Sequence, residues 1–153
     1  MIIIGYQGIG KSTLANSCFK YIDLESGCFW VDGKRHDDWY IAYTQMAEHL
    51  SKQGYSVFVS SHEVVRNSLV DSDEKVICCV PDISLKDKWI EKLKLRYEKS
   101  GLEKDYKAYM NAFDRFSENI NEIMSSGFGI LKITSIDYGL KELIDSVSNE
   151  YGR

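Results

Sequence analysis

Short apolar runs alternate with longer amphipathic stretches along the chain of 153 residues. The first run, MIII, is continuous and β-branched, which is typical of a strand buried on both faces of a sheet. Four further runs have the length and composition of short strands. The five predicted strands cover residues 1–4, 21–25, 55–60, 75–80 and 127–133.

Stretches with helical spacing of apolar residues follow the predicted strands. In the clearest example, Tyr43, Ala47 and Leu50 recur near helical spacing, and Gly54 is a suitable C-terminal stop. Ser84, with an aspartate three residues on, is expected to cap another helix. Residues 28–39 are expected to be irregular, with part of them extended. The predicted helices cover residues 10–21, 39–54, 62–69, 84–99, 103–126 and 137–147, with a break near the start of the stretch 103–126.

Strands that alternate with helices predict a parallel sheet covered by helices on its faces. The length of the chain suits one domain and leaves no room for a second independent core. We therefore expect residues 1–153 to form a single three-layer α/β/α domain around a five-stranded parallel sheet.

Composition and charge restrict the partners that the protein is expected to bind. Apolar residues make up 44% of the chain and charged residues 27%, which is ordinary for a soluble globular protein. The net charge of −4 argues against binding a nucleic-acid polymer through a broadly basic surface, although it is compatible with a local basic cleft. No apolar stretch approaches the roughly 20 residues of a membrane span. Only four residues precede Gly5, so no signal peptide is expected.

The cysteines and histidines lack the spacing of a zinc site or a redox motif. No two cysteines have C-x-x-C spacing, and the histidines are not grouped with them. The thiols are expected to be buried as small apolar groups in a reducing compartment, and the protein is expected in the cytoplasm as a monomer or homodimer. These residues are Cys18, Cys28, Cys78, Cys79, His36, His49 and His62.

The segment GYQGIGKS, residues 5–12, fits the pattern G-x-x-x-x-G-K-[ST] at every position. Glycines let successive backbone N–H groups point at one anion, Lys11 can reach the β- and γ-phosphates, and the Ser12 hydroxyl can ligate Mg²⁺. The pattern lies between a predicted strand and a predicted helix, which is the context it requires. ATP is expected rather than GTP, because the chain contains no N-K-x-D or D-x-x-G motif. The predicted phosphate-binding residues are Gly8, Ile9, Gly10, Lys11, Ser12 and Thr13.

Two acidic residues follow the second predicted strand, at the edge where parallel sheets place their ligand-binding groups. Asp23 and Glu25 alternate along the chain, so their side chains point to the same side of the strand. Asp23 is a candidate general base for an acceptor hydroxyl and a candidate outer ligand of Mg²⁺, and Glu25 is a candidate acceptor-binding residue. The alternative is that one of them caps the turn that follows.

The third predicted strand ends in SSHE, residues 60–63, where a Walker B aspartate is often found and none is present. Ser60 or Ser61 could contact phosphate or magnesium-bound water, and Ser61 could equally cap the next helix. His62 is expected to be a turn residue rather than a catalytic one.

Arg66 and Trp30 are candidates for the acceptor side of the site. Arg66 belongs to the short helix after the third strand, where an arginine can form a bidentate clamp on a second phosphate or lie in solvent. Trp30 and neighbouring aromatic residues could stack on a base, although aromatic side chains are more often part of the core.

Lys88, Lys92 and Arg96 recur every four residues and therefore share one face of a helix. Such a charged stripe is usually a solvated face. Here it leads into a polar segment, about residues 97–114, that is a candidate lid, and Arg115 follows that segment. Arg96 and Arg115 are therefore candidates for stabilising charge on a transferred phosphoryl group.

Together these residues resemble the nucleoside and nucleotide kinase group of P-loop proteins, and especially small kinase-like proteins of phages and bacteria. The resemblance rests on GYQGIGKS, DLES, SSHEVVR and the VP…W…R run from Val80 to Arg96. It implies the strand order 2-3-1-4-5, ATP with Mg²⁺ as donor, an acceptor region after the second strand and a lid after the fourth. The D-G-[FY]-P-R segment of adenylate kinases and the Asp-Arg-Ser motif of deoxynucleoside kinases are absent, so the acceptor stays open.

The resemblance also implies roles for individual residues. Lys11 and Ser12 match the phosphate and metal positions of the group. Asp23 matches the acidic position after the second strand. Arg66 matches the arginine that binds the acceptor phosphate, and Arg96 matches the lid arginine.

Three functions fit these observations. The first is an ATP-dependent phosphotransferase acting on a nucleotide, a nucleoside or a related small acceptor, with a modified base in DNA as a variant that the acidic charge disfavours. The second is an NTP hydrolase or nucleotide switch, which predicts a clear Walker B acid that the chain lacks. The third is a nucleotide-binding protein without turnover, in which Asp23 and Arg96 are expendable.

Overall fold

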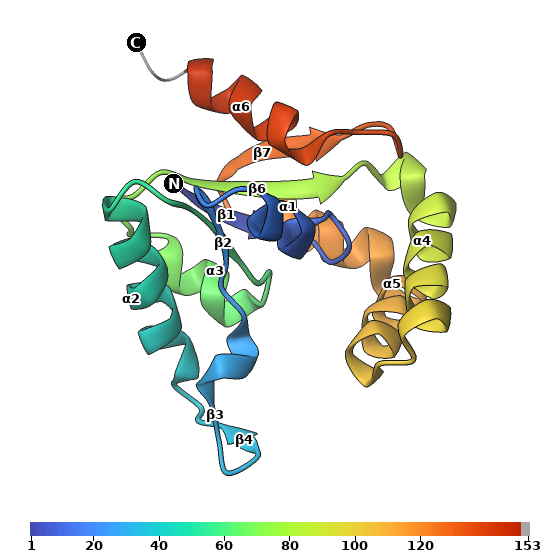
Figure 1. The fold of residues 1–153 in the computed structure, drawn as a ribbon, viewed down its shortest axis with the longest axis horizontal. Helices are drawn as coiled ribbons and strands as arrows, with labels where there is room; N and C mark the ends of the chain where they lie inside the picture. The colour runs from blue at the N-terminus through green and yellow to red at the C-terminus, as the bar shows by residue number, and fades with distance from the viewer. Residues whose placement is uncertain (151–153) are drawn as a thin grey trace.

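The computed structural model describes residues 1–150, apart from the side chains of Cys28 and Glu150. Its centre is a five-stranded sheet in which all paired strands are parallel, as predicted (Figure 1). The strand order is β2-β5-β1-β6-β7. The strands are β1 (Ile2–Gly5), β2 (Tyr21–Asp23), β5 (Ser56–Val59), β6 (Val76–Pro81) and β7 (Gly129–Ile133).

The central position of β1 explains its uninterrupted apolar sequence. Ile2, Ile3 and Ile4 have no exposed surface. β1 pairs with β5 on one side and β6 on the other, so that Ile3 lies between Phe58 and Ile77. Because both faces of the strand are covered, apolar side chains are needed at successive positions. The carboxyl ends of the parallel strands meet at one edge of the sheet, where the glycine loop begins.

The described part of the chain contains six α-helices, and the arrangement is compatible with a three-layer α/β/α fold (Figure 1). Helix α2 contacts β5 and β1, α5 contacts β6, and α6 contacts β7. The helices are α1 (Lys11–Ser17), α2 (Trp39–Lys52), α3 (Glu63–Leu69), α4 (Lys86–Ser100), α5 (Glu103–Met124) and α6 (Leu140–Glu150).

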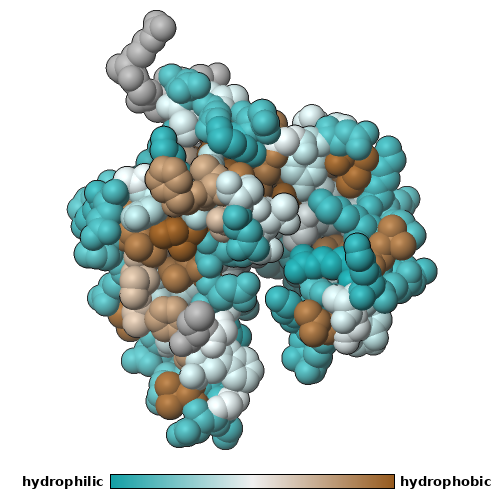
Figure 2. All heavy atoms as spheres, in the orientation of Figure 1, coloured by the Kyte–Doolittle hydropathy of each residue, from teal (hydrophilic) through white to brown (hydrophobic). Residues whose placement is uncertain are grey.

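Two arms extend from the body of the molecule and flank a cleft (Figures 1 and 2). One arm ends in a hairpin of β3 (Trp30–Val31) and β4 (Lys34–Arg35). The other is the corner between α4 and α5, which pack against each other along their length. The cleft therefore lies between a segment that follows β2 and a segment that follows β6.

The β3–β4 hairpin occupies the region that the sequence predicted as irregular with an extended part. Its loop is Asp32-Gly33, and both residues have a positive φ, of 50° and 76°. Positive φ at both loop residues is what a type I′ turn requires, and Asp-Gly is a favoured sequence for that turn. A short 3₁₀ helix, η1 (Ser26–Phe29), precedes the hairpin.

Three predicted helix boundaries are corrected. Helix α1 ends at Ser17 and not near residue 21 as predicted, because the backbone of Cys18 is already extended. Ser84 does not cap α4: it lies in a 3₁₀ turn, η2 (Ile83–Leu85), where its backbone N–H donates to the Asp82 carboxylate. The break in α5 is at its middle rather than its start, where Arg115 has φ −139° and ψ 25°.

The cysteine predictions are confirmed in part. Cys78 and Cys79 are buried in β6, and burial raises the pKa of each thiol to about 12, which makes them unreactive. Cys18 is a free thiol that is only partly buried, and the side chain of Cys28 lies outside the described part of the chain. Within residues 1–150, no helix combines the length and the apolar character needed to cross a lipid bilayer.

Candidate functional site

The glycine loop between β1 and α1 has a backbone conformation that favours glycine at two positions. Gly8 and Gly10 have φ of 84° and 100°, in the left-handed region that other residues rarely adopt. A Cβ on Gly8 would also lie 2.8 Å from Leu93 Cδ2 and 3.3 Å from Trp89 Nε1. The loop therefore needs glycine at Gly8 for its turn and for the close approach of α4.

Two carbonyl groups of the loop are held by side chains from other elements. Trp89 Nε1 donates to the Gln7 carbonyl at 3.0 Å, and Tyr138 Oη donates to the Ile9 carbonyl at 2.8 Å. By contrast, the backbone N–H groups of residues 8–10 donate no hydrogen bond within the described part of the chain. Backbone donors that no protein group engages are available to an anion bound in the loop.

Lys11 is the first residue of α1, and its side chain reaches back along the loop. Its Nζ donates to the Gly5 carbonyl at 3.3 Å. Burial lowers the pKa of this ammonium group, while the charges of Asp23 and Glu25 act in the opposite direction. A cation that is partly desolvated beside free backbone donors attracts an anion more strongly than a cation in water.

A cavity of about 840 Å³ lies over the loop, in the cleft between the two arms (Figure 2). We call it the large cavity. Its volume is in the range of small-molecule sites. All the predicted phosphate-binding residues, 8–13, line it, and so do Asp23, Glu25 and Arg96. The structure thus brings together the predicted phosphate loop, both predicted acids and one predicted lid arginine.

Asp23 ends β2 and faces the loop across the large cavity. Burial raises the pKa of its carboxyl group, and the positive charge of Lys11 partly offsets this effect. Glu25 lines the same cavity two residues on and is exposed. The predicted placement of the two acids on one side is therefore consistent with the structure. Neither residue caps the turn, since the residues of η1 receive no side-chain cap.

Tyr43 fixes the ends of β2 and β5 relative to each other. Its Oη donates to the Leu24 carbonyl at 2.6 Å and accepts a hydrogen bond from the Ser60 backbone N–H at 2.9 Å. The side chain is fully buried, and burial raises the pKa of its hydroxyl group to about 12, so it stays protonated. Tyr43 therefore ties the residue that follows Asp23 to the end of β5, without lining the large cavity itself.

The predicted lid, about residues 97–114, is an ordered corner between two helices. Gly101 ends α4 with φ 65°, and α5 begins at Glu103. The corner brings Asp105 back against Arg96, whose Nε lies 2.9 Å from Asp105 Oδ1. Both residues line the large cavity, and so does Lys104.

Lys92 belongs to α4, and its side chain contacts the connection from β7 to α6. Its Nζ donates to Tyr138 Oη at 3.1 Å and lies 4.4 Å from the centre of the Trp89 ring. Burial lowers the pKa of Lys92, and the nearby charge of Arg96 adds to the shift. Lys92 lines the large cavity, whereas Lys88, on the same predicted stripe, does not.

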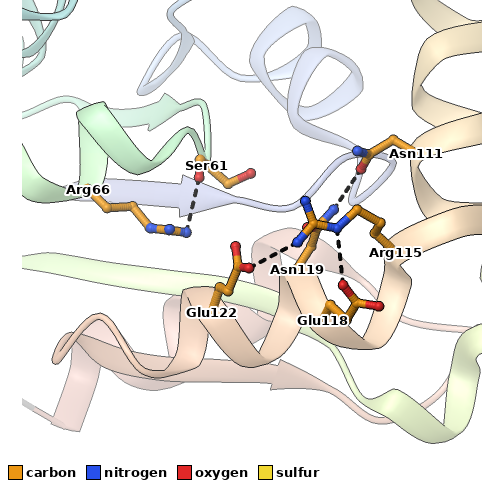
Figure 3. Close-up of polar contacts among 7 residues, drawn as sticks. All are labelled: Ser61, Arg66, Asn111, Arg115, Glu118, Asn119 and Glu122. Carbon is orange, nitrogen blue, oxygen red and sulfur yellow. Dashed lines mark hydrogen bonds and ion pairs between the residues drawn. The ribbon is translucent and has the colours of Figure 1, made fainter.

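A second cavity, of about 360 Å³, adjoins the large one and shares Gln7, Lys11 and Ser60 with it. We call it the small cavity. Arg66 lines it and is only 7% exposed. Its Nη1 donates to the Ser61 carbonyl at 3.3 Å, while its buried Nε has no hydrogen-bond partner (Figure 3). No carboxylate of the described residues forms an ion pair with this guanidinium group.

The opposite wall of the small cavity is formed by side chains of α5: Asn111, Asn119, Glu122 and Ile123. Figure 3 shows the first three of them. Asn111 Oδ1 accepts hydrogen bonds from Asn119 Nδ2 at 2.8 Å and from Gln7 Nε2 at 3.1 Å. Gln7 Nε2 also donates to the Ala108 carbonyl at 3.0 Å. The wall of the small cavity is therefore tied to the glycine loop through Gln7.

The segment that follows β5 lines the small cavity. Ser60 lines both cavities, and Ser61, His62 and Glu63 line the small one. Ser61 does not cap α3, because the residue before that helix is His62. His62 Nδ1 lies 2.8 Å from Ser60 Oγ, and burial together with the charge of Arg35 lowers the pKa of its imidazole.

Arg115 and Trp30 are not brought to either cavity. Arg115 forms ion pairs with Glu118 and Glu122, each at 3.2 Å, on the second half of α5 (Figure 3). Trp30 lies on the hairpin with 52% of its surface exposed, and its ring centre is 5.7 Å from Arg35 Cζ. Their predicted roles in catalysis and acceptor binding stay predictions that this arrangement does not favour.

The side chains that line the large cavity decide whether Mg²⁺ could be held there. Within residues 1–150, no group of three or more histidine, cysteine or acidic side chains is placed to hold a metal ion. Mg²⁺ in phosphoryl-transfer sites commonly needs only one or two protein ligands, because phosphates and water complete its shell. Ser12 and Asp23 both line the large cavity, so the residues present fit such a partial set.

Several polar residues of the large cavity were not singled out as site residues from the sequence. Lys104, Asp105 and Tyr138 lie on segments far from the loop in the chain, and Lys92 was considered only as part of a helical stripe.

No family model matches this chain, and no curated protein sequence is significantly similar to it.

Proposed function

We propose that this protein is an ATP- and Mg²⁺-dependent phosphotransferase that moves the γ-phosphate to a nucleotide, a nucleoside or a related small acceptor. One observation supports this more than any other. The N–H groups of residues 8–10 donate to no protein group among the described residues, and they adjoin the ammonium group of Lys11 in a cavity of about 840 Å³. Donors and charge of this kind match a polyphosphate.

The order of the strands supports the assignment to the P-loop kinase group. Numbered along the chain, the strands of the sheet run second, third, first, fourth and fifth across it. In this order the loop after β1 adjoins the ends of β5 and β6, and the two arms follow β2 and β6. A site at the carboxyl ends of parallel strands is where open α/β sheets bind ligands.

The residues of the large cavity divide the proposed reaction between them. The N–H groups of residues 8–10 and Lys11 bind the phosphates of the donor. Asp23, whose pKa is raised by burial, accepts the proton of an acceptor hydroxyl as that oxygen attacks the γ-phosphorus and ADP leaves. Arg96 stabilises the negative charge that spreads over the transferred group. Ser12 would hold Mg²⁺ as a direct ligand and Asp23 as an outer ligand, and the ion would neutralise charge on the phosphates.

The small cavity supports a transfer to a second molecule rather than to water. It adjoins Lys11, and its volume of about 360 Å³ exceeds what a single water needs. Arg66 offers a buried cation that forms no ion pair with a carboxylate of the described residues, which favours an acceptor that carries a phosphate or another anionic group.

The test is transfer from γ-labelled ATP with Mg²⁺ to a panel of acceptors. The panel contains nucleosides, nucleoside monophosphates, DNA with hydroxymethylated bases, and water alone. Label on one small acceptor supports the proposal, and label on DNA supports the modified-base variant. Release as inorganic phosphate, at a rate that no acceptor changes, would instead establish the NTP hydrolase or switch. The Lys11→Ala variant is the control for contaminating activity.

A further inference from the structure

Asp105 is a buried acid on the wall of the large cavity that the proposed reaction has not yet used. Only 4% of its surface is exposed. Oδ1 lies 2.9 Å from Arg96 Nε, and Oδ2 accepts a hydrogen bond from Ser100 Oγ. Burying a carboxylate is unfavourable unless it is paired in this way. The corner at Gly101 makes the pairing possible, because it turns the chain back on the end of α4.

The pairing uses one particular nitrogen of Arg96. Asp105 contacts Nε, and neither terminal nitrogen of the guanidinium group donates a hydrogen bond within the described part of the chain. Arg96 has a half-exposed side chain and lines the large cavity. A planar guanidinium group fixed at Nε can therefore offer its terminal nitrogens to a ligand in a defined orientation.

We propose that Asp105 is a positioning residue that holds Arg96 toward the phosphate groups in the large cavity. This rests on the proposed phosphotransferase function. Asp105 does not touch the reacting atoms in this account, and acts only through Arg96. The orientation it imposes reduces the reorganisation needed when charge develops on the transferred group.

The pairing also sets a requirement at position 96. An arginine can be held by Asp105 and still bind phosphate, because it has donors on three nitrogens. A lysine carries its three donors on a single nitrogen, so contact with Asp105 keeps that nitrogen beside the carboxylate and lets it reach only a phosphate that lies next to Asp105. Arg96→Lys is therefore expected to lose most of the activity lost by Arg96→Ala, although it keeps the charge.

A purely structural role for Asp105 is the competing explanation. It would hold the α4–α5 corner together through Ser100 and leave Arg96 unaffected. The two roles differ in one measurable respect. A positioning role requires Arg96 to be present, whereas a structural role does not.

A double-mutant cycle distinguishes the two roles. Asp105→Asn, Arg96→Ala and the double variant are compared for kcat and for KM of ATP, with the melting temperature of each recorded. Glu103→Gln, on the exposed pair with Lys107 in the same turn of α5, is the matched control. We expect Asp105→Asn to lower kcat about tenfold and Asp105→Ala about 10²-fold, with KM little changed. In the Arg96→Ala background, Asp105→Asn should change kcat less than about twofold.

The same double-mutant cycle can be measured through the affinity for MgADP with aluminium fluoride, in an assay to which no acceptor is added. Asp105→Asn should weaken this transition-state analogue about tenfold, and leave MgADP alone unchanged within about twofold. Equal losses in the presence and absence of Arg96 would overturn the proposal, as would a loss confined to KM. A wild-type protein that transfers no label would contradict the proposed function instead, and the binding cycle would still decide the role of Asp105.

Discussion

The two adjoining cavities differ in where their walls come from and in how their charges are matched. The proposed phosphate-binding wall of the large cavity is a single run, residues 8–13, and two of the cations that line the cavity face acids: Arg96 pairs with Asp105, and Lys11 faces Asp23. The small cavity draws its wall from three distant segments, within residues 5–11, 60–66 and 111–123. Glu63 and Glu122 also line it, but no acid among residues 1–150 forms an ion pair with its buried Arg66.

This difference shows what each cavity needs from a ligand. Matched charges keep the large cavity stable when it is empty, so its ligand competes with contacts that already exist. An unmatched buried guanidinium group destabilises the folded protein until an anion arrives. The small cavity should therefore depend more strongly on the charge of its ligand.

The largest expected effect is that of Lys11→Ala. Removing this ammonium group takes away the charge beside the loop N–H groups, and transfer of label from ATP should fall to background. The folded state should persist, because burial already lowers the pKa of Lys11 and disfavours its charged form. Far-ultraviolet circular dichroism and the melting temperature check the fold. Turnover at the wild-type rate would show that the glycine loop is not the donor site.

Asp23→Asn is expected to lower kcat by about 10² to 10⁴, the range for loss of a general base, while ATP still binds. Retained kcat would make Asp23 a structural residue of the turn.

The melting temperature of the same variant tests the electrostatics of the large cavity. The pKa of Asp23 is raised by burial, so the folded state favours the protonated form.

The sign of the stability effect follows from that shift. Wild-type protein gains from protonated Asp23 below the pKa of the unfolded chain, and loses this contribution as the pH rises through the higher pKa of the folded state. Asp23→Asn should therefore melt at a higher temperature than wild type near pH 7, with the difference shrinking as the pH falls toward about 4. A difference that grows on acidification would contradict the predicted direction.

Arg66→Met tests the unmatched charge of the small cavity. We expect KM for a phosphorylated acceptor to rise about 10- to 100-fold, because a charge-assisted contact is lost, while KM for ATP stays nearly constant. Without ligand, the variant should be at least as stable as wild type, since an apolar side chain replaces an unpaired buried cation. Arg66→Lys is the control that keeps the charge without the planar fork. An unchanged acceptor KM, or a marked loss of stability, would show that Arg66 is a structural residue.

Arg115→Ala has the smallest expected effect. Its guanidinium group is paired with Glu118 and Glu122 on an exposed face of α5, and it lines neither cavity. Exposed pairs of this kind contribute about 0–1 kcal/mol, so kcat should change less than about threefold. A loss of 10²-fold or more would restore the catalytic role that the sequence predicted for Arg115 and would require the α4–α5 corner to move.

Local sequence determined the sheet and the glycine loop. Strands buried on both faces need uninterrupted apolar runs, so β1 could be recognised from MIII alone. The loop could be recognised because its conformation and its charge depend on neighbours in the chain: Gly8 and Gly10 supply the positive φ, and Lys11 follows directly. For the same reason the Asp-Gly turn of the hairpin was open to prediction, although only an extended segment was predicted there.

The tertiary structure alone decided which distant charges meet. Arg96 and Arg115 both flank the corner in the sequence, but the turn at Gly101 pairs Arg96 with Asp105 in the large cavity, while the break in α5 leaves Arg115 with Glu118 and Glu122. Arg66 and Asn111 are 45 positions apart and line the same cavity only because α3 and α5 flank the glycine loop. Spacing along a chain fixes contacts within a helix or a turn, whereas the packing of helices fixes contacts between them.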